Sequence, residues 1–165
     1  MSRQKQKGNA FERVTAEHLT KVFDLKFFRT PGSGAYVGGR NFHRAHDMTN
    51  SQQLLLEGDI VVPEELADLK FECKTLKTFS FSSLYNKNAT FDSWLEQAHS
   101  DDKMWFLVFK INNRGSFVAY DSHKYEPLLV PQESNHMQYK NITITRLDGF
   151  FELNRDMLLS FCSSK

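Results

Sequence analysis

The 165-residue chain has only two cysteines, four prolines, no long apolar run and a net charge of +1. Two cysteines do not make a disulfide framework, so we expect both to be reduced and the protein to be cytoplasmic. No segment has the length and apolarity of a membrane span or secretion signal, so we expect no membrane partner. A charge near zero argues against a globally polycationic protein, and any contact with nucleic acid must come from local basic clusters.

The chain length predicts a single domain over residues 9–165, preceded by a flexible basic arm over residues 1–8. The arm would lie along phosphate groups, or it would fray without a role. The main predicted helices cover 9–24, 90–100 and 154–161, and the predicted strands cover 26–29, 58–62, 70–74, 105–111, 116–120 and 141–147. This order predicts a mixed α/β fold with a central mixed β-sheet flanked by helices.

The central feature is a pair of short runs, residues 58–62 and 70–74, which read as two neighbouring strands of a hairpin. Side chains alternate faces along a strand, so Glu72 and Lys74 share the polar face. A register that brings Asp59 beside them would create a site with two carboxylates and one ammonium group.

Two carboxylates, helped by a backbone carbonyl, suit a hard divalent cation such as Mg²⁺. The cation polarises a phosphoryl oxygen and activates a bound water, and a lysine beside it orients that water or stabilises negative charge. The alternative is an exposed strand with a cross-strand ion pair of little energetic weight. Spacing alone favours this alternative, because such patterns arise often by chance.

Glu12 lies on the apolar side of the first predicted helix, whereas Glu17 lies on the outer face between Arg13 and Lys21. A carboxylate on an inward face is costly unless it is paired or binds metal, which makes Glu12 a candidate site residue. The alternative is that Glu12 only complements the helix dipole.

A glycine-containing turn follows the short strand that ends in Arg29. Arg29 and Ser33 are suited to holding a phosphate there, although such a segment is usually only a turn. The long polar segment over 35–56 adds Arg40 and Arg44. Its histidines lack the partners and spacing of a zinc site, so we expect no zinc.

Taken in order, these features resemble the PD-(D/E)xK nuclease superfamily, and within it the archaeal Holliday junction resolvases and their viral relatives. The connection that leads to Asp59 is longer than expected for the family, and Gly58 stands where many members have proline. The resemblance covers residues 7–110 and depends on the ordered set Lys7, Gly8, Glu12, Arg13, Arg29, 32–34, Asp59, Ile60 and 72–74.

The resemblance implies a restriction-endonuclease-like fold and a homodimeric, Mg²⁺-dependent endonuclease, in which Mn²⁺ would substitute for Mg²⁺. The enzyme would cut branched or four-way junction DNA and leave 5′-phosphate and 3′-hydroxyl ends. A virus-encoded protein that acts inside a host cell fits this family.

The resemblance also assigns roles to individual residues. Asp59 and Glu72 would bind the metal with the carbonyl of Cys73, Glu12 would complete its environment, and Lys74 would act on the attacking water. Ser33 and Arg29 would engage the scissile strand. The implied DNA-binding residues are Lys7, Arg13, Arg29, Ser33, Arg40, Arg44 and Lys77.

Two other readings remain: another nuclease of the same fold, for flaps, nicks or restriction sites, and a non-catalytic DNA-binding protein. The intact set Asp59, Glu72 and Lys74 argues against the second. The apolar segment with Phe79 and Phe81 has two equal interpretations, a dimer contact or a place in the monomer core.

Overall fold

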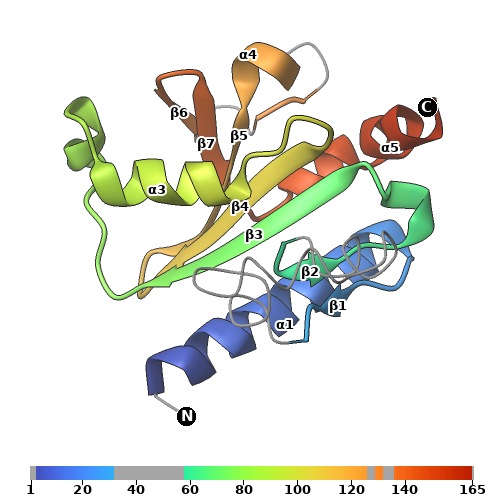
Figure 1. Cartoon of the computed structure of the whole chain (residues 1–165), viewed down its shortest axis with the longest axis horizontal. Helices are drawn as coiled ribbons and strands as arrows, with labels where there is room; N and C mark the ends of the chain where they lie inside the picture. Colours follow the sequence, from blue (N-terminus) through green and yellow to red (C-terminus); the bar gives the residue numbers. More distant parts are fainter. Residues whose placement is uncertain (1–2, 32–57, 126–128, 132–135, 165) are drawn as a thin grey trace, which may run out of the picture.

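The computed structural model of the chain describes residues 3–31, 58–125, 129–131 and 136–164, and it has a five-stranded sheet at its centre (Figure 1). The strand order is β3-β4-β5-β7-β6, and β3 pairs with β4 in parallel while the other neighbours are antiparallel. The predicted mixed sheet is therefore confirmed. The strands are β3 (Leu69–Leu76), β4 (Met104–Ile111), β5 (Gly115–Asp121), β6 (His136–Tyr139) and β7 (Ile142–Arg146).

Helices pack on both faces of this sheet (Figure 1). Strand β4 is buried except at Lys110, and its side chains alternate between two cores. Phe106 and Val108 belong to the core with α1 and α5, and Leu107 and Phe109 to the core with α3. The α-helices are α1 (Arg3–Phe23), α3 (Ala89–Ala98), α4 (Ser122–Tyr125) and α5 (Phe150–Ser163), and the 3₁₀-helices are η2 (Glu64–Leu66) and η3 (Phe81–Tyr85).

The predicted hairpin between residues 58–62 and 70–74 is wrong. Strand β2 (Ile60–Val61) instead pairs antiparallel with β1 (Phe28–Arg29) in a separate two-stranded sheet. Val62, Pro63 and the 3₁₀ turn η2 follow β2, so the chain leaves the strand direction before it can form a hairpin with β3. The segment still reaches β3, because the Asp59 N–H donates to the Phe71 carbonyl at 2.8 Å.

Helix α1 begins at Arg3, not at the predicted Asn9, so residues 3–8 belong to the helix. Arginine, glutamine and lysine are good helix formers, and they outweigh the cost of about 1 kcal/mol for Gly8 inside the helix. Glu12 is buried and Glu17 is exposed, as their positions on the helix predict. Val14, placed on the apolar side by its spacing, is 58% exposed instead.

The other helix boundaries also differ from the predicted ones. Helix α3 begins at Ala89, one residue before the predicted start, and it is capped by Asn88, whose side chain accepts from the Phe91 N–H. Helix α5 begins at Phe150, four residues before the predicted start, after Gly149 in a left-handed conformation. None of the described helices is long and apolar enough to cross a membrane.

The apolar segment after β3 packs in the monomer. The Phe79 ring lies within 6.1 Å of Phe109, and the Phe81 ring lies 5.0 Å from Phe117, measured between ring centroids. Leu84 is buried in the same core. The structure therefore favours the monomer-core interpretation of this segment over a dimer contact.

Candidate active site

Asp59 is held against the outer edge of β3 by backbone hydrogen bonds. Its N–H donates to the Phe71 carbonyl at 2.8 Å, and its carbonyl accepts from the Thr30 N–H at 2.9 Å. Gly58, just before it, has a φ of +80°, and a Cβ atom there would lie 2.6 Å from the Phe71 oxygen. Only glycine therefore allows the backbone to approach β3 this closely.

The Asp59 carboxylate reaches along the same edge to Cys73, whose N–H donates to Oδ2 at 2.8 Å. Backbone groups alternate between the two edges of a strand. The Leu76 carbonyl accepts from the Asn112 N–H beyond the end of β4, so even-numbered residues of β3 face β4. The Cys73 carbonyl therefore faces the outer edge, beside Asp59.

Glu72 and Lys74 stand on one face of β3, as predicted, and form an ion pair at 2.5 Å between Oε1 and Nζ. Their side chains are 13% and 24% exposed, so the pair is mostly removed from water. Burial raises the pKa of Glu72, and the nearby charge of Asp59 raises it further, while Lys74 opposes both effects. The negative charges of Asp59 and Glu72 therefore repel one another in a site that is mostly removed from water.

Glu12 is also paired. Its Oε2 accepts from Arg29 Nε at 2.5 Å, and a second guanidinium nitrogen of Arg29 donates to Asn9 Oδ1 at 3.0 Å. The cost of burying the Glu12 carboxylate is therefore offset by a cation. The Arg29 guanidinium, predicted to contact the scissile strand, is held between two side chains of α1.

The buried Cys73 thiol lies close to all three carboxylates. Burial raises its pKa well above the usual value, and the charges of Asp59, Glu12 and Glu72 raise it further. Helix α1, the segment before β2 and strand β3 therefore bring the three predicted acidic residues to one place. These effects favour the protonated form of the Cys73 thiol when no metal is bound.

The donor set fits a divalent cation with few protein ligands. Asp59 and Glu72 supply carboxylate oxygens, and the Cys73 carbonyl faces the same edge. Within the described part of the chain, no three His, Cys, Asp or Glu side chains form a ready-made metal cluster. A hard divalent cation that keeps several of its waters needs no more protein ligands than these.

The other predicted DNA-binding residues separate into two groups. Lys7, Arg13 and Lys77 lie on the surface. Ser33, Arg40 and Arg44 lie outside the described residues, as does the whole segment over 35–56.

Sequence reasoning missed the roles of two residues. Asn9, expected only as the first residue of the helix, accepts a hydrogen bond from Arg29 beside Glu12. Gly58, noted only as a departure from proline, is the residue that admits Asp59 to the edge of β3. The signal for Asn9 was its spacing, since a residue three positions before Glu12 shares its side of the helix.

The sheet with helices on both faces, and an aspartate beside an E-x-K strand, define a nuclease of the PD-(D/E)xK class. Over residues 3–160 the chain matches the family described as "Phage putative PDDEXK endonuclease", and it belongs to this family. The family supports an endonuclease, and nucleases of this class typically use divalent metal ions. No curated protein and no solved structure matches the chain.

Proposed function

We propose that the protein is a Mg²⁺-dependent endonuclease that cuts branched DNA, and that it acts as a Holliday junction resolvase. The observation that carries the catalytic part is the Asp59 carboxylate bound to the Cys73 N–H at the outer edge of β3, beside the Glu72–Lys74 pair. The choice of branched DNA is supported by the order of motifs shared with the resolvases.

Each residue has a task in the proposed reaction. A cation bound by Asp59, Glu72 and the Cys73 carbonyl would polarise the scissile phosphate and lower the pKa of a bound water. Lys74, fixed by Glu72, stabilises the negative charge that develops on the phosphate. The water oxygen loses a proton and bonds to phosphorus, the bond from phosphorus to the 3′ oxygen breaks, and that oxygen takes up a proton. A 5′-phosphate and a 3′-hydroxyl remain.

Glu12 has a positioning role in this proposal. It lies inward on α1, near Cys73, and it fixes the guanidinium of Arg29. Because Glu12 holds Arg29 in an ion pair, the guanidinium would add positive charge near the outer edge of β3 without taking the place of the metal. Mn²⁺ would substitute for Mg²⁺, since oxygen ligands suit both ions.

The proposed assembly is a homodimer with two-fold symmetry. One site cuts one strand, and resolving a four-way junction needs two cuts. Two sites related by a two-fold axis match the symmetry of such a junction.

The test compares labelled four-way junction, flap and linear duplex DNA, each with Mg²⁺, with Mn²⁺ and with a chelator. We expect paired nicks in the junction, little cleavage of linear duplex, and none with chelator. Cleavage of flaps alone, or of linear duplex as fast as junctions, would reject the resolvase and leave another endonuclease of this fold.

The dimer is tested by light scattering at micromolar concentration and by mixing active chains with Asp59→Asn chains. Heterodimers should leave singly nicked junctions, because only one of their two sites can cut. A monomer that resolves junctions would contradict the proposed assembly.

A further inference from the structure

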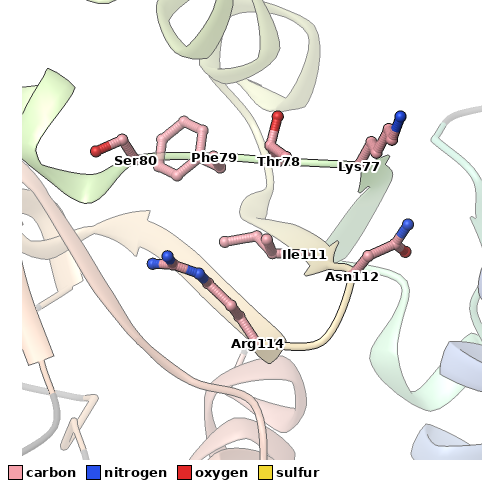
Figure 2. A pocket seen from close by; sticks show the side chains of 7 residues that line it. All are labelled: Lys77, Thr78, Phe79, Ser80, Ile111, Asn112 and Arg114. Carbon is pink, nitrogen blue, oxygen red and sulfur yellow. The ribbon is translucent and has the colours of Figure 1, made fainter.

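A hollow of about 340 Å³ opens where β3 ends (Figure 2). One wall is the segment that leaves β3, and the other is the turn between β4 and β5 (Figure 2). The Ile111 side chain lies between the two walls (Figure 2). The lining residues are Lys77, Thr78, Phe79, Ser80, Ile111, Asn112 and Arg114.

The lining has the chemistry of an anion site. Lys77 and Arg114 bring two positive charges from opposite walls, and neither has a carboxylate partner among the described residues. Hydroxyl and amide groups stand between them, and the lining contains no acidic residue. Two cations with neutral donors suit a phosphate oxygen, because charge-assisted hydrogen bonds are the stronger ones.

The walls of the hollow are held by hydrogen bonds and ring contacts. The Asn112 N–H donates to the Leu76 carbonyl at 3.0 Å, and the Arg114 N–H donates to the Ile111 carbonyl at 3.1 Å. The Phe79 ring packs edge-on against Phe109. A ligand would therefore meet a preformed surface, which keeps the entropic cost of binding low.

The hollow lies along the strand that carries the candidate active site. Lys77 follows Glu72 by five positions, and at about 3.3 Å per residue this spans roughly 16 Å. Duplex DNA rises about 3.4 Å per base pair, so the hollow is within about five base pairs of a phosphate at the active site.

We infer that this hollow binds neighbouring backbone phosphates of the DNA substrate, between one and five nucleotides from the bond that is cut. The inference depends on the proposed function, because it assumes a nucleic acid at Asp59 and Glu72. The Lys77 ammonium and the Arg114 guanidinium point to different sides of the hollow (Figure 2), so each would contact a phosphate of its own, while Thr78, Ser80 and Asn112 would donate to phosphate oxygens. The site thus sets how the strand runs along β3.

Binding is measured by fluorescence anisotropy of a labelled junction in chelator, where nothing is cut. The variants are Lys77→Ala and Arg114→Ala, with Lys124→Ala as the control, because Lys124 is an exposed lysine on α4 at another part of the fold (Figure 1). We expect each pocket variant to weaken binding about 3- to 10-fold and to lower the slope of log affinity against log salt by about one. The control should do neither.

Charge-retaining variants separate binding from folding damage. Lys77→Arg and Arg114→Lys should keep the salt slope, and circular dichroism should show all variants folded. A second probe is DNA with a single neutral methylphosphonate at each of the five linkages on either side of the cut. One position should weaken binding to wild type but not to Arg114→Ala.

The two hypotheses fail in different ways. If wild type with divalent metal cuts no DNA, the proposed function fails. If wild type cuts DNA but both alanine variants keep its affinity and salt slope, the phosphate site alone is refuted. A methylphosphonate effect that persists unchanged in Arg114→Ala would also refute it.

Discussion

Asp59 has two tasks in this structure, and two substitutions separate them. Its carboxylate accepts from the buried Cys73 N–H, and it is the central ligand of the proposed metal site. Asp59→Asn keeps an oxygen that can accept this hydrogen bond but removes the charge. Asp59→Ala removes both.

The expected losses of stability follow from these hydrogen bonds. A charged acceptor is worth about 1 kcal/mol more than a neutral one, so Asn should cost about that amount. Ala leaves the Cys73 N–H without its acceptor, which costs about 1–3 kcal/mol. For a chain of this size, each 1 kcal/mol lowers the melting temperature by about 2–4 °C. Relief of the repulsion between Asp59 and Glu72 offsets part of either loss.

Activity should respond differently from stability. Both variants should cut junction DNA at least about 100-fold more slowly, equivalent to about 2.7 kcal/mol, while binding it nearly normally through lysines and arginines. Thermal unfolding, anisotropy in chelator and single-turnover cleavage with Mg²⁺ measure the three quantities. Wild-type cleavage by Asp59→Asn would refute the metal assignment. Equal stability of Asp59→Ala and wild type would show that the hydrogen bond from the Cys73 N–H to Asp59 does not stabilise the fold.

Three further predictions concern the carboxylates and the aromatic core. Glu12→Gln should slow single-turnover cleavage steeply whereas Glu17→Gln, the exposed control on the same helix, should not; equal behaviour would refute the face argument. The pKa of Glu72 is raised above its usual 4.5, so the folded protein binds the Glu72 proton more tightly than the unfolded chain does. The stability of the metal-free protein should therefore fall as pH rises from about 4.5 through the folded pKa. Glu72→Gln should flatten the dependence of stability on pH, measured by urea unfolding at several pH values. Mg²⁺ should raise the melting temperature of wild type more at pH 8 than at pH 5. Identical pH profiles for variant and wild type would contradict the raised pKa of Glu72. Phe79→Ala should cost about 3 kcal/mol in denaturant unfolding without changing the oligomeric state, since the ring packs within the monomer; a changed oligomeric state would restore the dimer-contact interpretation.

Much of the sheet could be predicted because its signals are local. The near-continuous apolar run of β4 is typical of a strand buried on both faces, and the turn to β5 follows it directly. The partner of β2 could not be predicted in this way, because β1 lies about thirty residues earlier in the chain. Strand β6 was also missed, since its burial alternates only weakly and β7 supplies its context.

In the candidate site too, local features could be predicted from the sequence and contacts between distant segments could not. The side-chain faces of Glu12, Glu72 and Lys74 follow from helix and strand periodicity alone, and the structure agrees. The contact between Arg29 and Glu12 could not be predicted, because it depends on how α1 packs beside β1. The approach of Asp59 to Cys73 likewise depends on one backbone conformation at Gly58.

The outer edge of β3 also matters for aggregation. An eight-residue edge strand offers unpaired N–H and carbonyl groups to any other extended chain. Here the Phe71 carbonyl and the Cys73 N–H are both taken by Asp59, one by its backbone and one by its side chain. The residue proposed to hold the metal therefore also blocks strand addition by a second molecule. We therefore expect a substitution that removes the Asp59 carboxylate to free the Cys73 N–H at this edge as well as to slow cleavage.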